Sequence, residues 1–208
     1  MCGRFILLTD LSVIVESFRI GEVADEYKPG GNISPGQQIS AVIRNEDVNK
    51  LVAFRWGLIP SWAKDPAIGN KMFNARAETV ADKPSFRSAF KKRRCLIIAD
   101  GFYEWAKLDK KKVPYNFALK TGGPFGFAGL YETWMSPENK AVNTCTIITT
   151  DANELLRPIH DRMPVIVPKD KEALWIDPGV RDQRELEAIL KPYPAEDMKM
   201  AEGFRHHQ

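Results

Sequence analysis

The first three residues, Met1-Cys2-Gly3, offer a chemistry that an internal cysteine cannot perform. Because Cys2 has a small side chain, we expect a methionine aminopeptidase to remove Met1 and leave Cys2 as the amino terminus. Its α-amine then has an ordinary pKa of about 7.7–8.0 and its thiol one of about 8.5, so both are partly deprotonated near neutral pH. Such a 1,2-aminothiol condenses with an aldehyde through the amine, and the thiol closes a thiazolidine ring. On the Met-Cys pair alone, an incidental cysteine is the commoner interpretation.

Glu104 is a candidate for proton transfer, in the segment Asp-Gly-Phe-Tyr-Glu-Trp at 100–105. If this run is a strand, its side chains alternate, so Phe102 and Glu104 share one face while Tyr103 and Trp105 share the other. Loss of solvent beside Phe102 raises the pKa of a carboxyl group toward the range useful for proton transfer. The alternative is an exposed glutamate paired with a lysine, which the spacing alone favours slightly.

His160 is the one histidine outside the last three residues, so it is the sole imidazole candidate for a general acid or base. Asp161 either orients this imidazole or pairs with Arg162, and a structural role in a hydrogen-bonded loop is an open alternative. The three cysteines form no CxxC pair, and no second His or Cys stands at ligand spacing. We therefore expect no metal site.

Several side chains are suited to a nucleic acid. Four arginines present forked donors that fit phosphates: Arg4, Arg76, Arg87 and Arg162. Flat aromatic faces suit unstacked bases, and each stacked base contributes about 1–3 kcal/mol. Trp56 stands in a strand-like run and is expected in the core, whereas Trp62 follows a Pro-Ser turn and is the better surface candidate.

Charge is distributed unevenly along the chain. The net charge is +3, with nine acids and five bases in 170–203 and a balance of +6 before that. Residues 83–94 contain six bases and no acid, and residues 107–112 contain four bases and one acid. Such clusters suit a phosphate backbone. A solvated basic face is the commoner cause, so charge alone does not indicate nucleic acid.

Composition indicates an ordinary water-soluble protein. The chain has 208 residues, 44% hydrophobic and 27% charged, which predicts one domain over 1–208 with an acidic, helical part at about 170–203. No apolar run approaches the roughly 20 residues of a membrane span, and no signal peptide is recognisable. We expect a reduced, cytoplasmic protein, nucleoid-associated if it is bacterial, with a monomer as the default state and no membrane partner.

Hydrophobic patterns predict more strands than helices. Strand character occurs in eight runs: 4–8, 39–44, 51–56, 95–99, 102–108, 115–119, 125–131 and 144–149. Helical periodicity occurs at 11–18, 85–91, 171–175 and 181–190, with Asp10 as the expected N-cap of the first helix. Because the two types do not alternate regularly, we predict an α+β fold: a curved or barrel-like, mainly antiparallel sheet with peripheral helices.

Together the polar and aromatic segments resemble those of the SRAP family (SOS response-associated peptidase), whose members are abasic-site processing proteins. The matching blocks keep the family's order and span most of 1–166: Met-Cys-Gly-Arg-Phe at 1–5, Asn-Ile-Ser-Pro-Gly at 32–36, Arg-Trp-Gly-Leu-Ile-Pro-Ser-Trp at 55–62, Asn-Ala-Arg-Ala-Glu-Thr-Val at 74–80, Lys-Pro-Ser-Phe-Arg at 83–87, Arg-Arg-Cys-Leu-Ile-Ile-Ala-Asp-Gly-Phe-Tyr-Glu-Trp at 93–105, and Ile-His-Asp-Arg-Met-Pro-Val-Ile at 159–166.

The resemblance implies roles for matching residues. Cys2 would become linked to the ring-opened abasic deoxyribose, and Asn74 would position the Cys2 amine and the sugar. Glu104 would act as general acid and base in ring opening and in loss of water from the carbinolamine. His160 would assist proton transfer at the sugar.

The resemblance also implies partners. Arg4 and Arg76 would hold flanking phosphates, and Pro35 and Trp62 would lie beside displaced bases. The expected partner is single-stranded DNA with an abasic site, often near a junction with duplex, and neither a metal nor an organic cofactor is implied.

The sequence is also compatible with two other functions. In one, Cys2 and His160 form a thiol hydrolase or peptidase that acts on peptides, which requires an oxyanion hole. In the other, the chain is a non-catalytic single-stranded DNA-binding module in which Cys2 is incidental.

Overall fold

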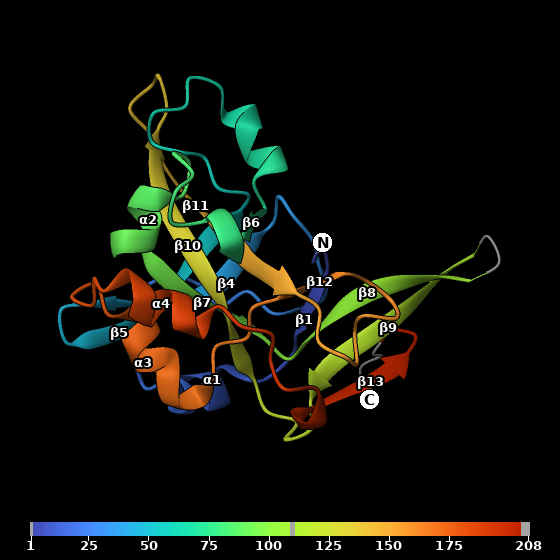
Figure 1. Ribbon diagram of the computed structural model, residues 1–208. Helices are drawn as coiled ribbons and strands as arrows, with labels where there is room; N and C mark the ends of the chain where they lie inside the picture. The colour runs from blue at the N-terminus through green and yellow to red at the C-terminus, as the bar shows by residue number, and fades with distance from the viewer. Residues whose placement is uncertain (1, 109–110, 205–208) are drawn as a thin grey trace.

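Five strands close into a barrel. The structure, a computed structural model, describes residues 2–108 and 111–204. The barrel strands are hydrogen-bonded in the order β11 (Ala141–Asp151), β10 (Phe125–Met135), β7 (Arg94–Ala99), β4 (Gln38–Asn45) and β5 (Val48–Trp56). These neighbours are antiparallel, and β5 then pairs in parallel with β11 to complete the ring (Figure 1). The predicted α+β class with a barrel-like, mainly antiparallel sheet is confirmed.

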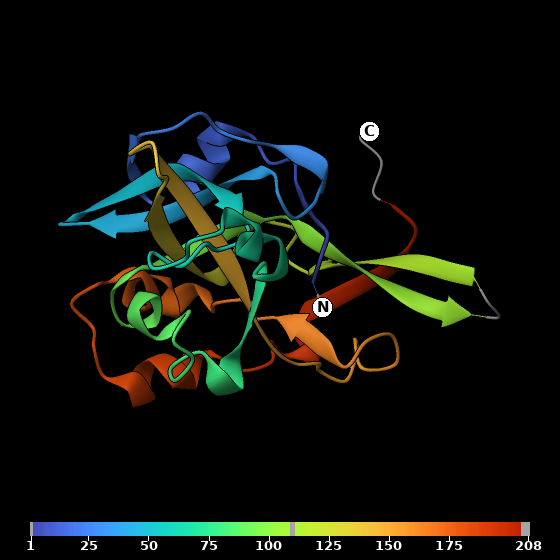
Figure 2. The same ribbon diagram turned by 90° about the horizontal axis from the view of Figure 1, so that it is seen from above.

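A second, antiparallel sheet supports the amino-terminal segment. Its strand order is β3 (Gly30–Ile33), β1 (Phe5–Leu7), β8 (Gly101–Leu108), β9 (Lys111–Leu119) and β13 (Met198–Glu202). The strand β1 lies between β3 and β8, with Phe5 opposite both Ile33 and Phe102. The β8–β9 hairpin projects from the body, with β13 along one edge (Figures 1 and 2). The residues just before β1 are thereby held against the base of this hairpin.

Aromatic side chains join the two sheets. The Phe5 ring lies 5.3 Å from Trp56 and 5.9 Å from Phe127, both on the barrel, and Phe102 lies 6.0 Å from Phe127 between centroids. Full burial of such a side chain stabilises the fold by about 1.5–3 kcal/mol. The predicted core position of Trp56 is confirmed, and Cys95 and Cys145 are fully buried as well.

The helices are short and lie outside the barrel. They are α1 (Leu11–Ser17), α2 (Arg87–Lys92), α3 (Glu172–Ile176) and α4 (Gln183–Ile189), with 3₁₀ turns at Pro66–Lys71, Ala77–Thr79, Lys169–Lys171 and Ala195–Asp197. Asp10 precedes α1 as predicted, but its side chain caps no N–H group. The acidic part, expected to be helical over about 170–203, ends in a strand instead: its last residues form β13, which pairs with β9.

Two short strands flank the end of β11. The strand β6 (Asn74–Arg76) runs parallel to it, with Asn74 opposite Ile147 and Arg76 opposite Thr149. The strand β12 (Arg162–Pro164) is antiparallel to it, with Arg162 opposite Asp151. Both views place β12 beside the amino-terminal segment (Figures 1 and 2). Residues from three distant parts of the sequence therefore meet at this end of the barrel.

None of the helices in the described parts of the chain combines the length and apolar character that crossing a membrane requires.

Candidate functional site

Cys2 is fully buried at the start of the β1 segment. The backbone N–H of Arg4 donates to its sulfur, but burial raises the pKa of the thiol well above its ordinary value, and the negative charge of Glu104 adds to the rise. The expectation that this thiol is partly deprotonated near neutral pH is therefore wrong for the folded protein. A nucleophilic sulfur at this position needs a nearby base to take its proton.

Glu104 is 4% exposed, on the face of β8 that also presents Phe102 to the core. The strand is held by the N–H of Tyr103, which donates to the carbonyl of Arg4 at 2.9 Å. Burial is the largest influence and raises the pKa of Glu104 to about 7, and Asp161 also raises it. Glu104 is therefore buried, and the exposed, lysine-paired glutamate that the spacing slightly favoured is wrong. Its pKa lies where one carboxyl group can both accept and donate a proton.

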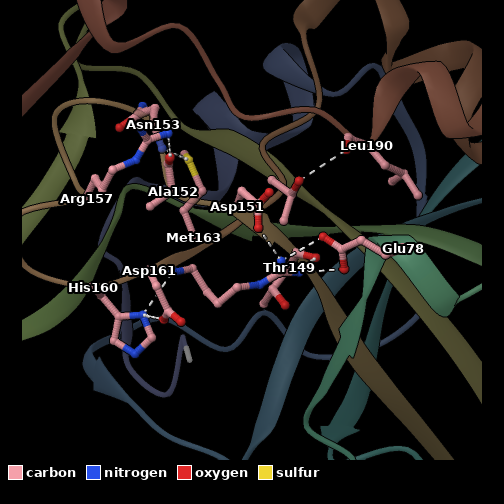
Figure 3. A network of polar contacts seen from close by, with 12 residues as sticks. Glu78, Thr149, Asp151, Ala152, Asn153, Arg157, His160, Asp161, Met163 and Leu190 are labelled. Carbon is pink, nitrogen blue, oxygen red and sulfur yellow. Dashed lines mark hydrogen bonds and ion pairs between the residues drawn. The ribbon is translucent and has the colours of Figure 1, made fainter.

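His160 lies in the loop that leads into β12, beside Asp161 (Figure 3). Its Nδ1 accepts a hydrogen bond from the backbone N–H of Arg162 at 3.0 Å and lies 3.0 Å from Oδ1 of Asp161. Burial lowers the pKa of the imidazole, so the neutral form is favoured near pH 7. Asp161 therefore influences the pKa of both Glu104 and His160, and Glu104 influences that of Cys2.

Asn74 presents an unused acceptor. Its Nδ2 donates to the carbonyl of Phe73 at 3.0 Å, whereas its Oδ1 is buried and has no hydrogen-bond partner among the described residues. A buried polar atom without a partner costs about 1–3 kcal/mol. A donor on a ligand, such as an amine or a sugar hydroxyl, would relieve that cost.

The other candidates lie at different distances from this centre. Arg4 follows Cys2 and donates to Oδ1 of Asn32 at 2.9 Å, while Arg76 is exposed on β6. Pro35 is half-buried in the turn after β3. Arg87 is exposed at the start of α2, which packs on β7 and β10 and lies well apart from the amino-terminal segment in both views (Figures 1 and 2).

Trp62 is 60% exposed, as its sequence context predicted. The next residue, Ala63, is fixed by Trp134, whose indole N–H donates to its carbonyl at 2.7 Å. Ile59, Ala63 and Trp134 form a small cluster separate from the main core. The exposed indole of Trp62 thus stands on a supported loop.

Arg162 is less available than its sequence suggested. Its Nη1 donates to Glu78 at 2.7 Å and to Asp151 at 2.8 Å; its Nη2 donates to Glu78 at 2.9 Å and to the carbonyl of Thr149 at 2.7 Å. A DNA phosphate would have to compete with two carboxylates. The sequence analysis did not identify Glu78 and Asp151 as partners of Arg162, although Glu78 is part of the Asn-Ala-Arg-Ala-Glu block.

Within residues 2–108 and 111–204, no three His, Cys, Asp or Glu side chains gather in a way that would hold a metal ion.

The arrangement can be compared with known proteins. The family model described as SOS response associated peptidase (SRAP) matches residues 1–202. The chain belongs to the SRAP family. Two relatives from Bacillus subtilis (strain 168), named abasic site processing proteins YoqW and YoaM, are 50% and 48% identical to this SRAP chain over 202 residues. Those matches cover 96% of this chain, with 90% of YoqW and 89% of YoaM.

A more distant relative and two solved structures are also similar to this chain over most of its length. The abasic site processing protein HMCES of Xenopus tropicalis is 30% identical, with 81% of this chain and 60% of HMCES covered. A crystal structure of a protein from Bacteroides thetaiotaomicron superposes with a TM-score of 0.88 at 26% identity, covering 97% of this chain and 91% of that one. One from Bordetella bronchiseptica gives 0.85 at 26% identity, covering 97% and 99%.

Proposed function

We propose that this SRAP protein processes abasic sites by capturing them covalently on Cys2 once Met1 has been removed. The observation that supports this most directly is the burial of both Cys2 and Glu104, and Asp161 influences the pKa of Glu104 and of His160. The names of the relatives, which describe abasic site processing, point to the same substrate.

The chemistry balances without a cofactor. An abasic deoxyribose opens to a C1′ aldehyde, and the α-amine of Cys2 adds to that carbon to give a carbinolamine. Loss of one water leaves an imine. The Cys2 sulfur then adds to the same carbon while its proton passes to a base, and the imine nitrogen is protonated. The product is a thiazolidine with the mass of protein plus DNA less one water.

Glu104 suits the proton transfers of this sequence. With a pKa of about 7, its carboxyl group is present in both protonation states at neutral pH. As an acid it protonates the leaving hydroxyl of the carbinolamine, and as a base it accepts the Cys2 thiol proton. Positioned acids and bases accelerate such steps by about 10²- to 10⁴-fold.

His160 and Asn74 act on the sugar in this scheme. Ring opening needs a proton at the ring oxygen, and a neutral imidazole with a proton on Nε2 can donate it. The buried Oδ1 of Asn74 would accept a hydrogen bond from the Cys2 amine or a sugar hydroxyl, which holds the two reacting groups together.

We assign the flanking DNA to the exposed side chains around this centre. Arg4 and Arg76 would contact phosphates beside the abasic nucleotide, and Trp62 and Pro35 would lie against displaced bases. Arg87, on a different side of the barrel, would contact more remote phosphates. The proposed ligand is single-stranded DNA, including a strand that continues into duplex, bound by a monomer.

The peptidase alternative depends on a reactive thiolate. Thiol peptidases use a cysteine whose pKa is lowered by a neighbouring cation, whereas burial and Glu104 raise the pKa of Cys2. This difference favours amine-first capture, in which the sulfur acts second on an already formed imine.

Intact-protein mass spectrometry tests the proposal. Wild-type protein lacking Met1 is incubated with a single-stranded oligonucleotide containing one abasic site; we expect a stable adduct of protein plus oligonucleotide less one water. Cys2→Ala keeps an amine, so borohydride should still trap its imine, but no stable adduct should form without borohydride. A variant with one residue added before Cys2 lacks the 1,2-aminothiol and should likewise form no stable adduct without borohydride. Absence of any wild-type adduct contradicts covalent capture.

A further inference from the structure

Two carboxylates and a carbonyl hold the Arg162 guanidinium. The side chain is only 12% exposed, and both oxygens of Glu78 accept from it, one from each Nη atom. Asp151 and the Thr149 carbonyl accept the remaining Nη bonds. Figure 3 shows Glu78, Thr149 and Asp151 converging on this point. Asp151 and Thr149 are on the strand that already pairs with β12, whereas Glu78 comes from a separate 3₁₀ turn.

The backbone of this same arginine contacts the imidazole of His160. Its N–H donates to Nδ1 of His160 at 3.0 Å. A neutral imidazole accepts at one nitrogen and donates at the other, so this bond requires the proton to be on Nε2. Oδ1 of Asp161 lies 3.0 Å from the same Nδ1 and favours the opposite tautomer, because a carboxylate can accept only from a protonated Nδ1.

We propose that Glu78 is a positioning residue that acts through Arg162: by clamping the guanidinium, it keeps the Arg162 amide on Nδ1 of His160 and maintains the tautomer with a proton on Nε2. When the clamp is released, Asp161 takes over Nδ1 and Nε2 becomes an acceptor. The consequence for catalysis rests on the proposed function, since only the Nε2–H form can give a proton to the sugar ring oxygen. The tautomer itself can be tested without DNA.

The clamp also explains what Arg162 offers to DNA. One guanidinium beside two carboxylates gives a local charge of −1, so this group of side chains does not attract a phosphate. Arg162 lowers the pKa of Glu78, which keeps this carboxylate ionised at neutral pH. Glu78→Gln therefore should affect the rate of capture and the affinity for DNA differently. Capture should be slower, because His160 changes tautomer. Non-covalent binding should be as strong as in the wild type or stronger, because a negative charge near the DNA is lost.

The chain provides a matched control. Glu187 lines the same surface hollow as Glu78 and Asp151, but it accepts a hydrogen bond from Gln183 on its own helix. Glu187→Gln removes the same charge from the same hollow without releasing the Arg162 guanidinium.

The decisive measurement is the ¹⁵N NMR spectrum of the histidine-labelled protein at pH 7.5, with the His160 signals assigned from a His160→Gln variant. We expect a protonated Nε2 and an unprotonated Nδ1 in the wild type and in Glu187→Gln. In Glu78→Gln we expect a large fraction with a protonated Nδ1, and in Glu78→Gln/Asp161→Asn a return to Nε2–H. Arg162→Lys keeps the backbone amide but loses the forked guanidinium, so it should also increase the fraction of His160 with a protonated Nδ1. This variant replaces Glu78→Gln in the test if Glu78→Gln fails to fold.

A wild-type tautomer in both clamp variants overturns the proposal. Single-turnover crosslinking tests the consequence: Glu78→Gln should react roughly tenfold more slowly than Glu187→Gln, within the range that misplaced catalytic groups show. An unchanged rate in a variant whose tautomer has shifted overturns the link to catalysis. If even the wild type forms no crosslink, the proposed function fails, while the NMR result still decides the role of Glu78.

Discussion

Cys2 and Glu104 form a buried pair in which the charge of Glu104 disfavours the thiolate of Cys2. The negative charge of Glu104 contributes to the raised pKa of the Cys2 thiol, and both side chains are almost completely withdrawn from water. Two adjacent anions are costly in a medium of low dielectric constant. The pair therefore favours one shared negative charge, which allows the thiol proton to pass to the carboxylate as the sulfur attacks.

Glu104→Gln should slow the formation of the crosslink by about 10²- to 10⁴-fold, because glutamine neither accepts nor donates the proton. The wild-type single-turnover rate should show an inflection near pH 7, the pKa of Glu104, and the variant should lack it. Rates from pH 5.5 to 9 on one abasic oligonucleotide provide the measurement. If the rate of the variant still shows this inflection, a group other than Glu104 titrates near pH 7.

The same substitution should change the pH dependence of stability. The folded-state pKa of Glu104, about 7, is above its ordinary value of 4.5, so the folded protein binds the proton more tightly than the unfolded chain. The associated stability is complete below pH 4.5 and is lost as the pH rises through 7. This loss amounts to at most about 3–4 kcal/mol, because the pKa changes from 4.5 to about 7 at 1.36 kcal/mol per pKa unit.

Glu104→Gln removes that loss, so its free energy of unfolding relative to wild type should increase between pH 5 and pH 8. Urea denaturation at both pH values measures the difference. Parallel profiles for the two proteins would contradict a buried, titrating Glu104.

The thiol of Cys2 should react slowly with iodoacetamide in the folded wild type, because the reactive species is the thiolate and burial suppresses it. In Glu104→Gln the neighbouring charge is gone, so the pKa of the thiol falls and alkylation should accelerate. Cys95 is an internal control, since burial alone raises its pKa. Peptide mass spectrometry after timed labelling should show faster modification at Cys2 with no change at Cys95; equal acceleration at both would indicate general loosening of the fold.

The sequence predicts the long strands because their hydrophobic pattern is set locally. All eight predicted runs overlap observed strands. The short strands β2 (Ile20–Val23), β3, β6, β12 and β13 were not predicted, since three to five residues contain too little periodicity and their pairing depends on remote partners. The face that Glu104 shares with Phe102 was predicted because alternation along β8 is also a local property, whereas the spacing slightly favoured an exposed Glu104 over the buried one observed.

The contacts of Arg162 show where sequence-based prediction ends. Arg162 and Glu78 are 84 residues apart, and their ion pair exists because β6 and β12 pair with the same stretch of β11. No local pattern reports such a contact. The raised pKa of Cys2 has the same origin, since it depends on burial by distant strands.

Arg76→Gln should weaken the binding of single-stranded DNA and reduce its salt dependence, because each phosphate contact that is lost removes about 0.7 from the slope of log K against log salt for single strands. Arg184 on α4 is also exposed, but it lies in the acidic part of the chain and is a control of equal charge. Fluorescence anisotropy at several salt concentrations measures both variants. Equal slopes for Arg76→Gln and Arg184→Gln would remove Arg76 from the DNA-binding surface.

Trp62→Ala should weaken DNA binding by about 1–3 kcal/mol, the range for one stacked base, with little effect on the melting temperature, because the indole is mostly exposed. Met135→Ala removes another exposed hydrophobic side chain and should leave binding unchanged. Trp134→Phe deletes the indole N–H that holds the carbonyl of Ala63 and keeps an aromatic ring in the small cluster. If Trp62 acts as a fixed platform, this third variant should bind DNA with an affinity between those of wild type and Trp62→Ala. Wild-type affinity in Trp134→Phe would mean that Trp62 meets the base without support from its loop.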